Sequence, residues 1–154
     1  MTQRFRLNAY SLQDFTLNVL NGNSLGIIIA LIPAALTSQL LTFFGQHPWV
    51  TTVTMMTNVA QSMLPIIAAF AVGAFLRLGT LESAAIALAS IVSGGVVHSN
   101  SNGLYTLAGS GAILNVMLVT YLSAGLVLLL QDKLGQLKLI FLPTIVLLVG
   151  GSIG

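Results

Sequence analysis

Long runs of apolar residues alternate along the chain with short polar segments. Five of these runs come close to the roughly 20 residues that one helical crossing of a bilayer requires. The pattern predicts transmembrane helices over residues 24–44, 53–76, 81–97, 113–130 and 137–153. The connection after the first helix contains Trp49, an aromatic residue type that is common at the membrane interface. The expected fold is therefore an all-α integral membrane protein with about five transmembrane helices.

Composition supports the membrane assignment and excludes several classes of protein. Hydrophobic residues make up 56% of the 154 positions and charged residues only 5%, against about 25% in soluble domains. The absence of cysteine excludes disulfides and thiolate chemistry. The net charge of +2 rests on scattered residues, whereas nucleic-acid binding needs clustered lysine and arginine. We expect the lipid bilayer as a partner, and no nucleic acid.

The few charged residues lie at the ends of the predicted helices. No charged residue lies between Asp14 and Arg77 or between Glu82 and Asp132. No charged residue follows Lys138. With five crossings and a cytoplasmic N-terminus, every lysine and arginine falls on the cytoplasmic side. The positive-inside rule therefore predicts a cytoplasmic N-terminus and an external C-terminus.

The N-terminal segment 1–23 is too polar for a signal peptide, because asparagines and other polar residues follow its arginines. Ser11 begins a capping-box pattern, and Leu12, Phe15 and Val19 follow on one helical face. Two interpretations fit this pattern. The segment is a cytoplasmic amphipathic helix on the inner membrane surface, or a cytoplasmic helix packed on the bundle.

Three prolines lie within predicted crossings: Pro33, Pro65 and Pro143. Each removes an intrahelical hydrogen bond and favours a kink. The kinks either serve helix packing, since proline is frequent in membrane helices, or mark a broken helix that lines a substrate site.

Small residues recur at spacings that let membrane helices approach closely. Gly22 and Gly26 form a G-x-x-x-G pattern, and Gly150 and Gly154 repeat it. The predicted helix at 81–97 is rich in alanine, serine and glycine. We interpret these patterns as packing surfaces, with the third helix the most buried of the bundle.

A polar, glycine-rich stretch at 98–112 joins the third and fourth predicted helices. Its asparagines, serines and backbone groups could bind the hydroxyls of a neutral polyol, and Tyr105 could stack on a sugar ring. The stretch is either an ordinary surface loop or a re-entrant loop that lines a ligand cavity.

Polar side chains in this stretch and within the crossings are the candidates for substrate binding. His98 could carry a proton or simply lie at the interface. Intramembrane amides either bond neighbouring helices or line a pathway. The candidate substrate-binding residues are Asn58, Gln61, His98, Asn100, Asn102, Tyr105, Ser110 and Asn115.

The sequence contains no recognisable catalytic pattern. It has no serine–histidine–aspartate set, paired carboxylates, histidine pair or phosphate-binding loop. Its three carboxylates are all predicted on the cytoplasmic side, which leaves little for acid–base catalysis. No acidic residue lies in the middle of a crossing, so a charge-driven pump is not expected. We expect neither an enzyme, nor a cofactor, nor a metal site.

Three segments resemble one bacterial family. Residues 21–35 read NGNSLGIIIALIPAA, residues 107–115 read LAGSGAILN, and the sequence DKLG at 132–135 precedes Leu142 and Pro143. They are similar to the EIIC-like membrane proteins of the sugar phosphotransferase system that include the toxin regulator PfoR. The resemblance runs from about Asn18 to the C-terminus. Where the family pattern has an acidic residue, this chain has Ala112, so no carboxylate role is expected there.

The resemblance implies a function and partners. Family members are longer, so residues 24–154 are expected to be a partial EIIC-like transmembrane domain, the N-terminal half. The implied role is a multi-pass permease component of the bacterial cell membrane that binds or translocates a neutral carbohydrate. EIIA and EIIB phosphocarrier proteins are the implied partners. Five short helices enclose little space, so we also expect a homodimer or larger oligomer.

Two alternatives stand beside the permease. The PfoR name suggests a membrane-embedded regulator or sensor, which would need a cytoplasmic output surface. A small structural oligomer would need only lipid-facing helices that pack closely.

Overall fold

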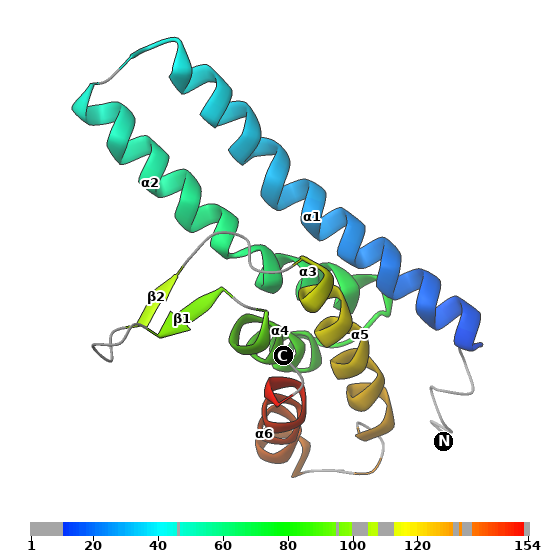
Figure 1. Ribbon diagram of the computed structural model, residues 1–154. Helices are drawn as coiled ribbons and strands as arrows, with labels where there is room; N and C mark the ends of the chain where they lie inside the picture. Colours follow the sequence, from blue (N-terminus) through cyan, green and yellow to red (C-terminus); the bar gives the residue numbers. More distant parts are fainter. Residues whose placement is uncertain are drawn as a thin grey trace.

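Helices dominate the computed structural model of the chain, which describes residues 11–45, 47–94, 96–99, 105–107, 113–130, 133 and 137–152. Figure 1 shows α1 and α2 as a long antiparallel arm that extends beyond the cluster of the remaining helices. The elements are α1 (Leu12–Thr42), α2 (Pro48–Ser62), α3 (Leu64–Phe75), α4 (Thr80–Ser93), β1 (Val97–Ser99), β2 (Tyr105–Leu107), α5 (Ile113–Leu130) and α6 (Lys138–Gly151).

Helix α1 begins at the predicted cap. Ser11 is the N-cap, and its Oγ accepts a hydrogen bond from the Asp14 backbone N–H at 3.1 Å, which satisfies one donor of the first turn. The helix then continues for 31 residues, so the N-terminal segment and the first crossing form one helix. Phe15 and Val19 are buried in the core. This burial favours the second interpretation of the segment, a helix packed on the bundle.

The second predicted crossing is a broken helix. Helix α2 ends at Ser62, α3 begins at Leu64, and the two are bent by 42°. Pro65 has no N–H, so the carbonyl of Gln61 has no i+4 donor, and the helix breaks there. Pro33 and Pro143 lie inside helices that continue through them.

The lengths of the helices fit a membrane protein. By length and composition, α1 and α5 can each cross a membrane, and α2 with α3 makes a third crossing if the bent pair counts as one. Helix α4 has 14 residues, about 21 Å at 1.5 Å per residue, which is shorter than the roughly 30 Å hydrocarbon core. The chain is an all-α membrane protein with a helix at each of the five predicted crossings, two of them short.

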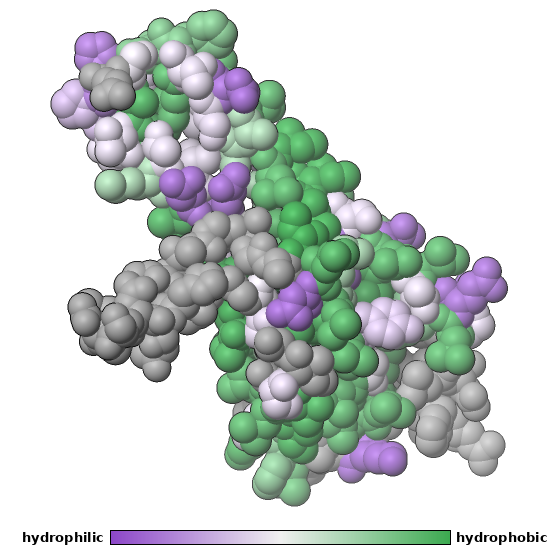
Figure 2. Space-filling view, viewed as in Figure 1, coloured by the Kyte–Doolittle hydropathy of each residue, from purple (hydrophilic) through white to green (hydrophobic). Residues whose placement is uncertain are grey.

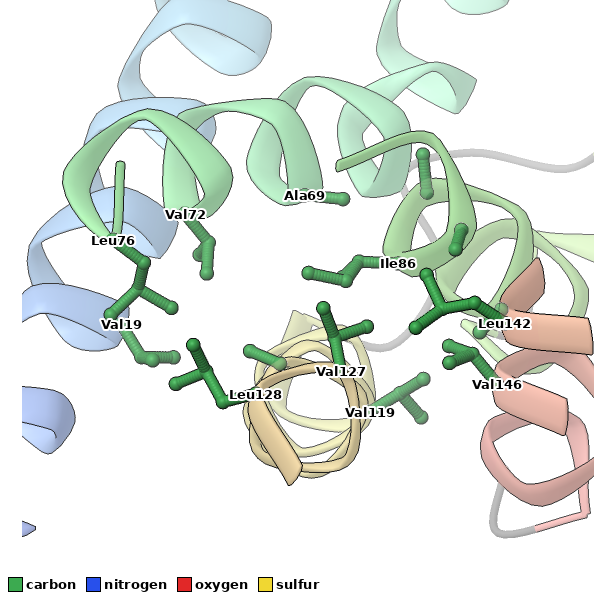
Figure 3. Close-up of a cluster of buried hydrophobic side chains, with 14 of the residues drawn as sticks. Val19, Ala69, Val72, Leu76, Ile86, Val119, Val127, Leu128, Leu142 and Val146 are labelled. Carbon is green, nitrogen blue, oxygen red and sulfur yellow. The ribbon is translucent and has the colours of Figure 1, made fainter. Parts of the chain in front are cut away.

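One apolar core joins five of the helices. Figure 3 shows side chains from α1, α3, α4, α5 and α6 directed toward a common centre. Helix α2 contributes nothing to this core among the described residues. The members include Val19, Val72, Ile86, Val127 and Val146. The core therefore holds the bundle, while α2 depends mainly on its packing against α1.

The glycine spacings predicted to bring helices together do so. Gly22 lies against Val72 and Gly26 against Ala68, where α1 crosses α3. Gly150 of α6 lies against Ala89 of α4. Its partner in the second spacing, Gly154, lies outside the described residues.

The turn between α3 and α4 contains a strained residue. Arg77 has a φ of +52°. Its N–H donates to the Ala74 carbonyl at 3.1 Å, and the Leu78 N–H donates to the Gly73 carbonyl at 2.8 Å. This pairing is the Schellman motif, whose left-handed position normally holds glycine.

We expect Arg77→Gly to raise the free energy of unfolding by about 1 kcal/mol, because a left-handed conformation strains residues with a Cβ by roughly that amount. Thermal unfolding in detergent measures the change. Arg77→Ala is the control, since alanine removes the charge and keeps the strain. Equal stability of the two variants would contradict the explanation.

Candidate functional site

A short β-hairpin lies between α4 and α5, in the stretch predicted as a loop. Strands β1 and β2 pair antiparallel, with Val97 opposite Leu107, His98 opposite Thr106 and Ser99 opposite Tyr105. His98 in β1 and Tyr105 in β2 therefore lie on neighbouring strands, but each is paired with the residue next to the other. The candidates Asn100, Asn102 and Ser110 lie outside the described residues.

Asn115 fixes the base of this hairpin. Its Nδ2 donates to the Ser93 carbonyl at 2.6 Å, so the start of α5 is tied to the end of α4. A Cβ added to Gly94 would lie 2.9 Å from Val116 Cγ2 and 3.3 Å from Pro65 Cγ. The end of α4, the start of α5 and the break before α3 therefore meet where the hairpin begins.

Asn58 and Gln61 lie in the last part of α2, just before the break at Pro65. Asn58 is exposed and Gln61 is half-buried. Figure 2 shows separate hydrophilic patches on a surface that is largely apolar. Among the described residues, no hydrogen bond joins either amide to Asn115. We call these three uncharged amides together the amide face: Asn58, Gln61 and Asn115.

A buried polar pair links α1 to α5 and was not among the sequence candidates. Thr120 Oγ1 lies 2.9 Å from Asn23 Oδ1 and also from the Val116 and Met117 carbonyl oxygens, so its single proton serves one of them at a time. Asn23 Nδ2 donates to the Val19 carbonyl at 3.1 Å. Asn23 is 1% exposed and Thr120 is 0% exposed. Asn23 could have been noticed as an amide inside the G-x-x-x-G motif. Its pairing with Thr120 fixes the register of the two helices.

Helix α4 has a buried hydroxyl face that packs on α6. Ser93 Oγ lies 2.8 Å from both the Ala89 and the Gly150 carbonyl oxygens, so its single proton can serve only one at a time. Ser90 donates to the Ile86 carbonyl. The Ser90 bond lies within α4, whereas the Ser93 contact with Gly150 joins α4 to α6, in agreement with the predicted packing role of this small-residue helix.

Ser123 of α5 is an exception, because its buried Oγ has no hydrogen-bond partner. An unpaired buried hydroxyl costs about 1–3 kcal/mol. We therefore expect Ser123→Ala to leave stability unchanged or raise it by about 1 kcal/mol, measured by thermal unfolding. A clear loss of stability would mean that the hydroxyl has a partner. Ser93→Ala is the control that removes a bonded hydroxyl and should destabilise.

The chemistry available at the amide face is hydrogen bonding without charge. Amides donate and accept, so they can bind hydroxyl groups. The described charged residues lie at or beyond helix ends: Asp14, Arg77, Glu82, Lys133 and Lys138. Over the described part of the chain, no three histidine, cysteine or acidic side chains come together to hold a metal.

The comparison with protein families gives one match. The sequence model of the family described as "Phosphotransferase system, EIIC" matches residues 17–154. No curated protein and no solved structure matches the chain significantly. The matched range includes every described helix except the first turns of α1.

Proposed function

Because the chain belongs to the EIIC family of the phosphotransferase system, we propose that it binds or translocates a neutral carbohydrate. EIIC domains are the sugar-transporting membrane components of this system and act with EIIA and EIIB proteins. The observation that carries the proposal is the family match over residues 17–154. Helices of membrane length and composition agree with it.

The proposed substrate site is the amide face together with the hairpin. Asn58, Gln61 and Asn115 offer uncharged donors and acceptors, which suit a substrate made of hydroxyl groups. Because Pro65 has no N–H, the Gln61 carbonyl at the break lacks its i+4 donor. Transporters use such broken helices to present backbone groups to a substrate.

The proposed orientation places the N-terminus in the cytoplasm of a bacterial cell, in a multi-pass membrane protein. Thr16 Oγ1 lies 3.0 Å from the Tyr121 hydroxyl, and Phe15 stacks edge-on against Tyr121. The start of α1 therefore lies beside the middle of α5. Arg77 follows the end of α3, and Lys133 follows the end of α5. With five crossings and a cytoplasmic N-terminus, every lysine and arginine of the sequence falls on the cytoplasmic side, which supports this orientation.

The proposed assembly is a homodimer or larger oligomer served by EIIA and EIIB phosphocarriers, which perform the phosphoryl transfer. The chain itself is then a permease component and not an enzyme. A PfoR-type regulator and a structural oligomer are the alternative functions, and the uptake assay distinguishes them from a permease.

Uptake of radiolabelled sugars tests the proposal. Cells that express the natural full-length product with EIIA and EIIB are offered a panel of hexoses, disaccharides and hexitols. We expect Gln61→Ala to weaken uptake of the transported sugar about two- to tenfold, the value of one neutral hydrogen bond of roughly 0.5–1.5 kcal/mol. The double variant Asn58→Ala/Gln61→Ala should lose more.

Gln39→Ala is the matched control, because Gln39 is an exposed glutamine on α1, away from the amide face. It should leave uptake unchanged. Equal uptake by wild type and the double variant would exclude the proposed site. No uptake of any sugar, with a cytoplasmic partner crosslinked to the N-terminal segment, would favour the regulator.

A further inference from the structure

The arm of the molecule joins the bundle through two helices, and each is weakened by a proline. Pro33 has no N–H, so the Ile29 carbonyl of α1 has no i+4 donor, although the helix continues through this point. In the second helix, Pro65 leaves the Gln61 carbonyl without its donor, and α2 bends by 42° into α3. Sharp bends in helices occur mainly at prolines.

The two weak points lie opposite each other. Gly26 of α1 lies against Ala68 of α3, where the two helices run antiparallel. One turn further along α1 lies Ala30, and one turn back along α3 lies Leu64. Ala30 and Leu64 belong to one small buried cluster. Leu64 is the first residue of α3, and Ala30 lies within the weakened turn 29–33, so both weak points lie at the same level of the molecule.

The helices are held differently on the two sides of this level. On the bundle side, Gly22 and Gly26 bring α1 directly against the backbone of α3, and Val19 and Val72 are fully buried in the core. On the other side, α2 contributes no described residue to either apolar cluster, and Ser62 is its one buried residue. The bundle therefore fixes the helices only up to the two prolines.

Beyond the prolines, the end of α1 and all of α2 pack on each other. We call this part, residues 34–45 and 47–62, the outer arm (Figure 1). Ala34 and Leu41 of α1 are buried in it, and α2 packs mainly on α1. At its tip, the rings of Phe44 and Trp49 meet edge-on with centroids 5.3 Å apart. The outer arm is therefore a packed unit.

We propose that the outer arm rocks on the bundle about a double hinge at Pro33 and Pro65. The hinge divides the amide face, because Asn58 and Gln61 lie on the outer arm and Asn115 lies on α5 in the bundle. Rocking changes the spacing between the two parts, which opens and closes the proposed substrate site. This role in transport rests on the proposed function, whereas the hinge itself does not.

Distances between pairs of spin labels test the hinge. The sequence has no cysteine, so labels attach only to introduced cysteines, and double electron–electron resonance measures each pair in lipid nanodiscs. Thr51→Cys on the outer arm with Leu88→Cys on α4 spans the hinge, and both positions are exposed. Position 51 lies about 18 Å along α2 from position 63. A change of about 20° at the break moves it by about 6 Å, and we expect a distance distribution broadened on that scale.

Two control pairs stay on one side of the hinge. Thr51→Cys with Leu36→Cys lies within the outer arm, and Leu88→Cys with Leu122→Cys lies within the bundle. All four positions are exposed. Both control pairs should give narrow distributions. A pair across the hinge that is as narrow as the controls would overturn the proposal.

Replacing the prolines tests the cause of the motion. Pro33→Ala and Pro65→Ala together restore two backbone donors, so the distribution across the hinge should narrow to the width of the control pairs. Pro143→Ala is the matched control, because Pro143 lies inside α6 in the bundle and its replacement should leave the distribution broad. Thermal unfolding confirms that each variant is folded. Equal widths in the double variant and in Pro143→Ala would overturn the proposal.

Adding sugar separates the hinge from its role in transport. A sugar taken up in the uptake assay should shift the distribution across the hinge, and Gln61→Ala should remove the shift. A broad distribution that no sugar shifts supports the hinge and contradicts the proposed substrate site. A narrow distribution with normal uptake overturns the hinge and leaves the proposed function standing.

Discussion

Replacing Gly26 with leucine should eliminate the folded protein. Gly26 lies directly against Ala68 of α3, and an added Cβ would overlap the Ala68 backbone. A side chain there forces α1 away from α3, which opens the contacts of both Gly22 and Gly26. Overpacking of a well-packed interior typically costs 1–3 kcal/mol or more. A backbone contact cannot be relieved by a rotamer change, so we expect a loss of at least about 3 kcal/mol.

Detergent-extracted yield, size-exclusion profile and thermal unfolding measure this loss. Gly125→Ala is the matched control on α5. The nearest atom to a Cβ at Gly125 is Phe15 Cζ, at an ordinary contact distance of 3.8 Å. Alanine favours a helix by about 1 kcal/mol over glycine, so this variant should be as stable as wild type or more stable. Normal folding of Gly26→Leu would contradict the close crossing of α1 and α3.

Local patterns predicted much of the fold. The cap at Ser11 and the close approach at Gly22 and Gly26 depend on residues within a few positions of each other, and the structure confirms both. The predicted crossing at 113–130 has the bounds of α5. The apolar pattern predicts where a helix forms, because a helix that faces lipid and a helix that faces a protein core both need apolar side chains.

The broken helix was predicted less completely. Pro65 was identified as a kink or a break, but so were Pro33 and Pro143, and only the helix at Pro65 breaks. A proline inside a membrane helix can be accommodated when neighbouring groups satisfy the freed carbonyl. Whether neighbouring groups satisfy that carbonyl depends on tertiary packing, which no local sequence pattern specifies.

The candidate substrate site stays a prediction. Within it, the structure shows that Asn115 bonds the Ser93 carbonyl. The hairpin was missed, although Val96 and Val97 before the polar stretch and Tyr105 and Thr106 within it are residue types that favour strands. The Asn23–Thr120 pair joins residues 97 positions apart, and no local pattern encodes such a contact.

Asn115→Asp should reduce sugar uptake at least about 100-fold. The change keeps the shape of the side chain and removes the donor to the Ser93 carbonyl, a bond of 2.6 Å. A carboxylate oxygen then faces a carbonyl oxygen, and two acceptors repel each other in a partly buried place. An unsatisfied buried carbonyl alone costs about 1–3 kcal/mol, and the repulsion between the two oxygens adds to that cost. Asn115→Ala should therefore be milder, about tenfold.

Two measurements separate a defect at the hairpin base from general unfolding. Hydrogen exchange at the amides of Val97 and Ser99 should accelerate in Asn115→Asp, while exchange in the middle of α5 should not change. Asn21→Asp is the matched control, since Asn21 is exposed on α1 and the same chemical change there should leave uptake intact. If Asn115→Asp transports normally, the link between α4 and α5 is not needed for transport. If uptake falls while hairpin exchange is unchanged, the hydrogen bond to the Ser93 carbonyl does not explain the loss. Asn115 then acts on the substrate directly.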